Sequence, residues 1–328
     1  MNLNLMMNKP TYFDNDYTMS EKFNGDSRLV LGTAGIGGLW GDVRENESID
    51  ALLYALDNGV EVLDTSPSYR DAQEFVGKAL ARWTGPKPFI STKVGRLKAD
   101  EPDEVYLDYS RDGMRKSVHK SLDLIGVDKI DLLFLHEPQL VPIDRIDEIL
   151  ETLGSFKDEG LVDRLGVGGN PVGEFYDYID GDLFDAVSGF LKLDACSLDA
   201  LDKDIPLFHK QDIAYYAASS LHMGLLGDRY QELTEERPGT QWVTDQQVDN
   251  AIKVHELAQQ NDMSLSELSL RYLISIKEAD RVVLGARNKQ QVKESLSFWE
   301  DGLLPRELFD EVTEIIIESE INATDHIK

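Results

Sequence analysis

Eight short apolar runs alternate with amphipathic runs along most of the 328-residue chain. Two of the short runs, "IDLLFL" and "RVVLG", are apolar at successive positions rather than at every second position. This pattern is typical of strands buried on both faces, which occur in parallel sheets covered by helices. No linker rich in proline or serine divides the chain. We therefore predict a single α/β domain, a (β/α)8 TIM barrel, rather than an open doubly wound sheet.

The predicted elements form eight strand–helix units. The strands are Arg28–Ile36, Val60–Thr65, Pro88–Val94, Ile130–His136, Asp163–Gly168, Ala186–Phe190, Ile213–Ala218 and Arg281–Gly285. The helices are Ser48–Asn58, Asp71–Trp83, Ser110–Ile125, Asp144–Glu159, Gly173–Ile179, Ser197–Lys203, Asp245–Gln260, Ser264–Ile276, Lys289–Trp299 and Pro305–Ser319. The long stretch Leu221–Thr244 has no predicted element. We expect a polar N-terminal extension at 1–27, the barrel at 28–304, and a C-terminal helix and tail at 305–328.

Acidic residues greatly outnumber basic ones. The chain carries 61 acidic and 33 basic residues, a formal net charge of −28. This charge repels nucleic acids and anionic membranes, so we expect neither as a partner. Cys196 is the only cysteine, which excludes an intrachain disulfide and fits a reducing compartment. No apolar run reaches the ~18 residues of a membrane span, and the N-terminus lacks the apolar core of a signal peptide. We expect a cytoplasmic protein; the sequence leaves its oligomeric state open.

Two glycine-rich stretches resemble a dinucleotide-binding loop but do not match it. "GIGG" at 35–38 is followed by Trp40, and "GVGG" at 166–169 by Pro171, where the pattern G-x-G-x-x-G needs its last glycine. The chain has neither a Walker A motif nor H-E-x-x-H. A metal-dependent hydrolase would need several histidines and aspartates at strand ends, so we expect no metal site.

Four titratable residues lie at or after the ends of three successive predicted strands. Asp64 ends the second strand, and Tyr69 lies in the loop that follows. Lys93 is near the end of the third strand and His136 ends the fourth. The C-terminal ends of barrel strands carry the chemistry in this fold, so we expect these four side chains to meet.

These residue types together suit proton transfer to or from a carbonyl or alcohol oxygen. A tyrosine has a pKa of about 10, and a neighbouring lysine ammonium stabilises the phenolate. We expect Lys93 to lower the pKa of Tyr69 by about three units, roughly 4 kcal/mol, while Asp64 keeps Lys93 charged. His136 can orient a substrate oxygen. Since no side chain supplies hydride, a nicotinamide cofactor is implied.

The sequence resembles the aldo-keto reductases over roughly residues 28–297. The motifs that carry the resemblance are "LGTAGIGGLWG", "DTSPSY", "STKVG", "LFLHEP", "LGVGGN" and "VVLGARNKQQVKES". The resemblance implies that Asp64, Tyr69, Lys93 and His136 are catalytic, with Tyr69 the general acid or base. The first two motifs look most like the branch of aldose 1-dehydrogenases that act on galactose, fucose or arabinose.

The same resemblance implies a site for NADP, with NAD as the alternative. The implied cofactor-binding residues are Gly32, Thr33, Asp64, Asn170, Ser188, Ser219, Leu221, Gly224, Gly285, Ala286, Arg287, Gln291 and Glu294. The segment "SSLHMGLLG" at 219–227 resembles the one that borders the cofactor pyrophosphate. Ser188 and Ser219 stand where many members carry glutamine and an aromatic residue. We expect Arg287 to bind the 2′-phosphate of NADP and so to distinguish it from NAD.

Three functions are compatible with these residues. The first is oxidation of an aldose at C1 to a lactone, and the second is reduction of small aldehydes or ketones by the same four residues. The third, of another class, is a subunit that binds nicotinamide cofactor without physiological turnover. In every case the expected ligands are the cofactor and a small sugar or carbonyl compound.

Overall fold

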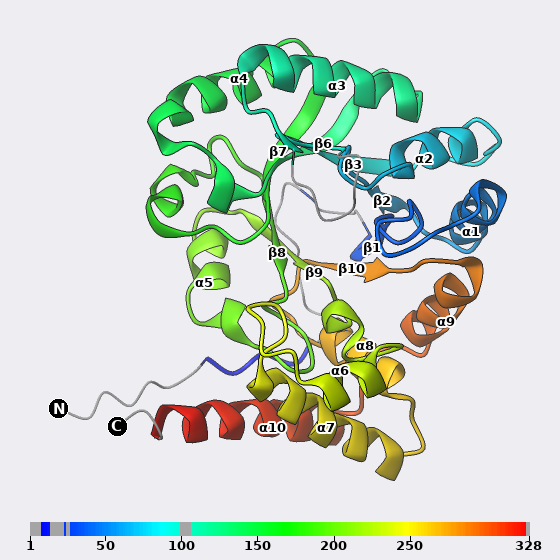
Figure 1. The fold of residues 1–328 in the computed structure, drawn as a ribbon, viewed down its shortest axis with the longest axis vertical. Coiled ribbons are helices and arrows are strands. Elements are labelled where there is room, and N and C mark those ends of the chain that lie inside the picture. The colour runs from blue at the N-terminus through cyan, green and yellow to red at the C-terminus, as the bar shows by residue number, and fades with distance from the viewer. Residues whose placement is uncertain (1–7, 14–22, 24–26, 99–105, 326–328) are drawn as a thin grey trace.

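The computed structural model describes residues 8–13, 23, 27–98 and 106–325, with side chains described as far as residue 321. Eight parallel strands close into a barrel in the order β1-β10-β9-β8-β7-β6-β3-β2, which confirms the predicted fold (Figure 1). The barrel strands are β1 (Leu29–Gly32), β2 (Val62–Asp64), β3 (Phe89–Val94), β6 (Ile130–His136), β7 (Val162–Gly168), β8 (Ala186–Phe190), β9 (Ala214–Ala218) and β10 (Arg281–Gly285).

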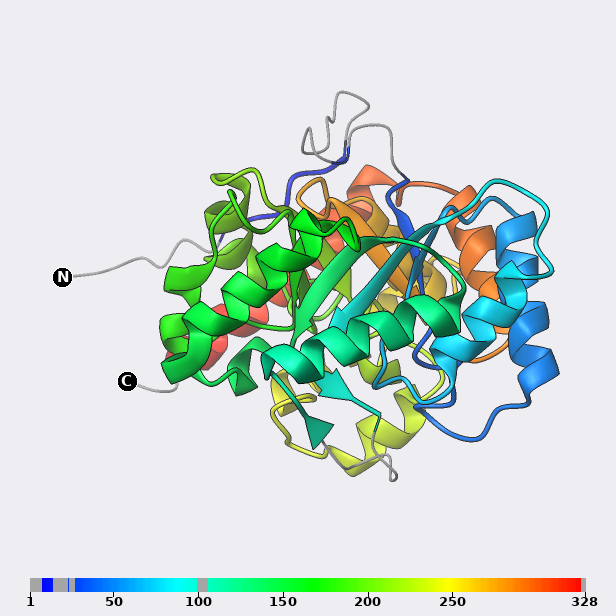
Figure 2. The same cartoon turned by 90° about the horizontal axis from the view of Figure 1, so that it is seen from above.

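Helices surround the barrel (Figures 1 and 2). The helices are α1 (Glu45–Asp57), α2 (Ala72–Leu80), α3 (Arg111–Ile125), α4 (Ile146–Asp158), α5 (Asp204–His209), α6 (Tyr230–Glu236), α7 (Asp245–Gln260), α8 (Leu265–Ile274), α9 (Lys289–Glu300) and α10 (Arg306–Asp325). Short 3-10 turns, including Gly173–Tyr178, complete the connections. Among the described residues, no helix is both long and apolar enough to cross a membrane.

Several predicted boundaries were wrong. The first strand ends at Gly32 rather than Ile36, because the chain turns there toward α1. The helix predicted at Ser197–Lys203 is instead a 3-10 turn followed by α5, which begins at Asp204 and carries Pro206 in its first turn, where proline is tolerated. The 221–244 stretch contains α6. A small antiparallel pair, β4 (Arg96–Leu97) and β5 (Tyr106–Leu107), was not predicted.

Alternate strand residues face two different apolar layers. The larger cluster joins strand residues such as Leu63 and Leu133 to the helices, so it lies outside the barrel. The smaller cluster contains Val62, Phe134 and other strand residues with Phe23, and it fills the barrel interior. Phe23 is 1% exposed, although we expected a polar extension there, and the Tyr12 ring packs on Phe309 of α10. The described part of the N-terminus therefore contributes to the core.

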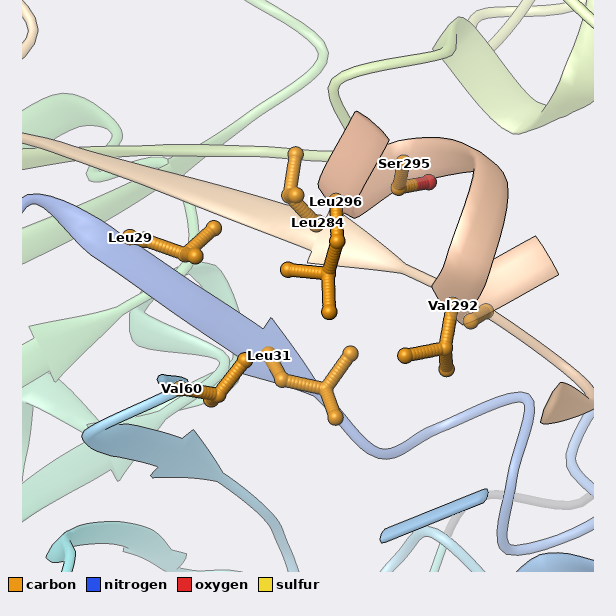
Figure 3. A pocket seen from close by; sticks show the side chains of 8 residues that line it. Leu29, Leu31, Val60, Leu284, Val292, Ser295 and Leu296 are labelled. Carbon is orange, nitrogen blue, oxygen red and sulfur yellow. The ribbon is translucent and has the colours of Figure 1, made fainter. Parts of the chain in front are cut away.

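A small apolar cavity separates α9 from strands β1 and β10 (Figure 3). Its lining is Leu29, Leu31, Val60, Leu284, Ala286, Val292, Ser295 and Leu296. Leu29 and Leu31 belong to the outer layer, so this cavity lies between sheet and helix rather than inside the barrel. It includes none of the four predicted catalytic residues and is a packing gap of the outer layer.

Candidate active site

The C-terminal ends of the barrel strands, here called the mouth, bring together the four predicted catalytic side chains. Asp64 lies two residues after Val62 and His136 two residues after Phe134, so both continue the inward-facing row of their strand. Lys93 Nζ is 5.6 Å from the centroid of the inward-facing Phe134 ring, so Lys93 also points inward. The period of two along a strand thus places an acid, an amine and an imidazole inside one mouth.

Asp64 and Lys93 form a buried ion pair. Lys93 Nζ donates to both carboxylate oxygens of Asp64, at 2.8 and 2.6 Å, and to the backbone oxygen of Thr65 at 3.0 Å. Ser91 Oγ donates to Asp64 Oδ1 at 2.8 Å. Burial lowers the pKa of Lys93, but the charges of Asp64 and Tyr69 outweigh it and raise that pKa overall. The ammonium therefore stays charged and fixed in place.

Tyr69 lies against this ammonium. Lys93 Nζ is 4.8 Å from the centroid of the phenol ring, and the His136 ring stands nearly perpendicular to it, 6.2 Å away between centroids. The loop that carries Tyr69 packs closely on the turn after β1. A Cβ added to Gly37 would come within 2.3 Å of the Tyr69 backbone oxygen, so only glycine fits that position. The "GIGG" stretch therefore helps to place the tyrosine.

The electrostatics of Tyr69 differ from our expectation. Burial raises its pKa, Lys93 lowers it and the Asp64 charge raises it again; overall the pKa lies above 10 rather than below. The prediction that Lys93 would bring the pKa down by about three units was therefore wrong for the net value. The predicted effect of Lys93 alone was right in direction, because the ammonium has the largest effect in favour of the phenolate.

His136 is neutral at the mouth. Burial, together with the positive charges of Lys93 and Arg96, holds its pKa well below 6.5. Tyr109 donates a hydrogen bond of 2.7 Å to the backbone oxygen of His136, which fixes the end of β6. A neutral imidazole has one N–H donor and can hydrogen-bond to a substrate oxygen without competing for the proton of Tyr69.

A second ion pair borders His136. Glu137 Oε1 lies 3.9 Å from His136 Nε2 and pairs with Arg96 of the β4–β5 hairpin. Glu137 has a left-handed backbone, with φ of 59°, which is uncommon for this residue type and concentrates at functional sites. Neither Glu137 nor Arg96 was predicted to belong to the site. The strain could not be read from "LHEP", and Arg96 reaches the site only through the unpredicted hairpin.

Besides Asp64, the residues implied to bind cofactor lie at the ends of β1, β8 and β10, on the loops after β7, β9 and β10, and in α9. Gly32 pairs with Asp64 and with Gly285 across the sheet, and Thr33 Oγ1 donates to the Asp64 backbone oxygen at 2.9 Å. Gly285 has open space where a Cβ would be. Ser188 continues the inward-facing row of β8. A Cβ at Gly32, by contrast, would lie 3.0 Å from Val283 Cγ1, so the open space is at Gly285.

Asn170 is tied to the protein backbone. Its side-chain amide donates to the Phe190 backbone oxygen at 2.8 Å and accepts from the Phe190 N–H at 2.9 Å. One amide hydrogen and one oxygen lone pair remain for a ligand. The residue thus joins the loop after β7 to the end of β8.

The remaining implied residues lie on the loops after β9 and β10. Ser219, Leu221 and Gly224 belong to the first loop, and Ser219 Oγ accepts from Met223 N at 3.3 Å. Gly285, Ala286, Arg287, Gln291 and Glu294 belong to β10, the second loop and α9. Asp228, which the sequence analysis did not single out, joins the two loops. Its Oδ2 accepts from Gln291 Nε2 at 2.6 Å and lies 3.4 Å from Arg287 Nη2.

Comparison with known families gives a match to the aldo/keto reductase family over residues 28–317. The chain belongs to this family. D-arabinose 1-dehydrogenase of Saccharomyces cerevisiae is 31% identical over 291 residues, covering 84% of this chain and 83% of that protein. L-galactose dehydrogenase of Arabidopsis thaliana is 26% identical over 280 residues, 83% of each chain. The resemblance inferred from the motifs is therefore confirmed.

Solved structures agree with the barrel fold of this aldo/keto reductase. An aldo-keto reductase from Bacillus halodurans in its holo form, AKR11C1, superposes with a TM-score of 0.72 at 22% identity, covering 94% of this chain and 96% of that one. Family membership makes this protein an oxidoreductase of the aldo-keto reductase type, and such enzymes use nicotinamide cofactors.

Proposed function

We propose that this aldo/keto reductase oxidises an aldose at C1 to a lactone with NAD(P) as hydride acceptor. The observation that carries the proposal is the placement of charged Lys93 between Asp64 and the ring of Tyr69, with neutral His136 facing that ring. The names of its sugar dehydrogenase relatives support a sugar as the substrate.

Each of the four residues has a distinct role in the proposed reaction. The hydroxyl oxygen of Tyr69 accepts the proton of the C1 hydroxyl, and Lys93 stabilises the phenolate that must be present for this step. His136 donates a hydrogen bond to the reacting oxygen and fixes its position. Asp64 holds Lys93. The nicotinamide, when bound, supplies the acceptor for the hydride that leaves C1.

The proposed contacts of the nicotinamide half are Asn170 and Ser188, with Gly32 at the end of β1. The loops after β9 and β10 are the proposed contacts of the phosphates, since loops after the seventh and eighth strands commonly bind phosphate in this fold.

The substrate class is tested by a panel of aldoses, simple alcohols and small aldehydes with both cofactors. We expect kcat/KM for an aldopyranose to exceed that for an aliphatic alcohol, because the second ion pair beside His136 offers polar partners to additional hydroxyl groups. Reduced nicotinamide is followed by its absorbance. If every aldose gave a lower kcat/KM than the simple alcohols, the sugar assignment would be wrong. If the protein only reduced aldehydes, the general reductase would be favoured. If it bound cofactor without turnover of any substrate, the cofactor-binding subunit would be favoured.

We propose NADP as the preferred cofactor, with Arg287 as its main determinant. The Arg287 side chain is 47% exposed beside the N-terminus of α9, a position suited to phosphate. Asp228 supports the alternative cofactor, NAD. A 2′-phosphate would compete with the Asp228 carboxylate for the guanidinium of Arg287. A charge-assisted hydrogen bond contributes about 1.5–3 kcal/mol. Arg287→Ala should therefore raise KM for NADP by about tenfold or more, and KM for NAD much less.

Steady-state kinetics with both cofactors tests the role of Arg287, and Lys289→Ala is the matched control. Lys289 lies over the Tyr54 ring, with Nζ 4.9 Å from the centroid, and should affect both cofactors little. An equal rise in KM for the two cofactors would show that Arg287 does not read the 2′-phosphate. A wild-type preference for NAD would overturn the assignment itself.

A further inference from the structure

Three polar side chains are completely buried between the loops that follow β8 and β9. Asp194 and His222 are 0% exposed and Cys196 is 2% exposed. Asp194 Oδ2 lies 2.7 Å from His222 Nδ1. Its other oxygen, Oδ1, accepts from the backbone N–H of Cys196 at 2.8 Å and from the thiol at 3.1 Å. Nothing in the proposed reaction uses this cluster.

The stability of the fold does not by itself require a charge pair at this position. A buried charge pair is often no more stabilising than apolar side chains of similar volume. Burial lowers the pKa of His222, but the Asp194 carboxylate, together with Gln247 and the Trp242 backbone, raises that pKa overall. The Asp194–His222 pair is therefore a specific contact that fixes the loop after β8 against the loop after β9.

His222 lies in the most strained backbone segment near the mouth. Ser219, His222 and Met223 have φ of 64°, 46° and 55°, all in the left-handed region that side chains disfavour. Such strain persists only where the surroundings determine the conformation, and it concentrates at ligand-binding sites. The buried bond to Asp194 anchors the centre of this segment.

The strained segment is part of the loop after β9, and it contacts the loop after β10. It follows β9, the seventh strand of the barrel, and ends at Asp228, which contacts Gln291 and Arg287 on the loop after β10, the eighth strand. In this fold the loops after the seventh and eighth strands commonly build the phosphate site. A shift of His222 would move the whole segment relative to that site.

We propose that the Asp194–His222 pair is a latch that holds residues 219–228 in the conformation that receives the cofactor phosphates. Asp194 and His222 are then positioning residues, which act through the segment and touch neither substrate nor cofactor. This inference rests on the proposed use of a nicotinamide dinucleotide. Without the latch, residues 219–228 adopt the binding conformation in only a fraction of the molecules. The apparent Kd is then the intrinsic Kd divided by that fraction.

Calorimetric titration of His222→Leu with NADP and NAD tests the latch. We expect Kd for each cofactor to rise by about tenfold, corresponding to a competent fraction of about one tenth. His222→Asn places an amide N–H close to the position of Nδ1, and should keep Kd within about threefold of the wild type. A melting curve of each cofactor-free variant measures stability separately. A lower melting temperature of His222→Leu with an unchanged Kd would show that the pair is only structural and would overturn the proposal.

Hydrogen exchange of the wild-type protein without cofactor tests the proposal even if His222→Leu does not fold. We expect the backbone amides of residues 219–228 to exchange slowly, as expected for a segment held in place before the ligand arrives. Rapid exchange there would contradict the latch. If the wild type bound none of the oxidised or reduced cofactors, the proposed function would fail and the latch with it. Normal wild-type binding with an equal Kd in His222→Leu would remove the latch alone.

Discussion

Replacing Tyr69 with phenylalanine is expected to lower kcat for aldose oxidation by a factor on the order of 10²–10⁴. The variant keeps the ring that contacts Lys93 and faces His136, and it loses only the hydroxyl that accepts the proton. Cofactor binding and the melting temperature should change little, because Lys93 keeps its hydrogen bonds to Asp64 and to the Thr65 backbone oxygen. Rapid-mixing kinetics of reduced nicotinamide formation measures the effect on the chemical step.

Tyr54→Phe is the matched control for this experiment. Tyr54 lies on α1 and contacts Lys289 through its ring, which phenylalanine retains. Its kcat should equal that of the wild type. Retention of more than a third of the wild-type kcat by Tyr69→Phe would rule out Tyr69 as the proton acceptor.

Replacing Lys93 with methionine is expected to have the second largest effect. The ammonium lowers the pKa of Tyr69, while burial and the Asp64 charge raise it. Without the ammonium the pKa of Tyr69 rises further, so a smaller fraction of the tyrosine is phenolate at neutral pH. The variant should therefore lose activity at pH 7, and the rising limb of its pH–rate profile for oxidation should move to higher pH. An unmoved limb, or one that moves to lower pH, would contradict the coupling of Lys93 to Tyr69.

Lys93→Met also leaves the carboxylate of Asp64 buried without its cation. Removing one partner of a buried pair costs about 3–5 kcal/mol, so the free energy of unfolding should fall by that order. The double variant Asp64→Asn/Lys93→Met removes both charges and serves as the control. It should recover much of the stability but not the activity, which separates the catalytic role of Lys93 from its structural one.

The fold and the four central residues could be predicted because both depend on short-range patterns. Strands such as Ile130–His136 carry a run of successive apolar residues, and their last one or two residues must lie at the mouth. Asp64, Lys93 and His136 follow from that rule. Tyr69 follows from its place in the loop after β2 and from the resemblance.

Other features of the site depend on contacts between distant loops. Arg96 reaches Glu137 through a hairpin of two-residue strands, which has too little periodicity to detect. Asp228 joins Arg287 and Gln291 across about sixty residues of sequence. The raised pKa of Tyr69 could not be predicted, because the effect of burial must be weighed against Lys93 in three dimensions. The helix α6 was not predicted either, and its contacts are with α7, which follows it in the chain.

The most direct test of the account follows the hydride itself. The wild-type enzyme is incubated with an aldose deuterated at C1 and with NADP or NAD, and the reduced cofactor is analysed by mass spectrometry and NMR. We predict one deuterium on each reduced nicotinamide, delivered to a single face of the ring, with lactone formed in equal amount and none of these products from Tyr69→Phe above about a hundredth of the wild-type rate. Reduced cofactor without deuterium, or a bound cofactor that no aldose reduces, would contradict the proposed oxidation at C1.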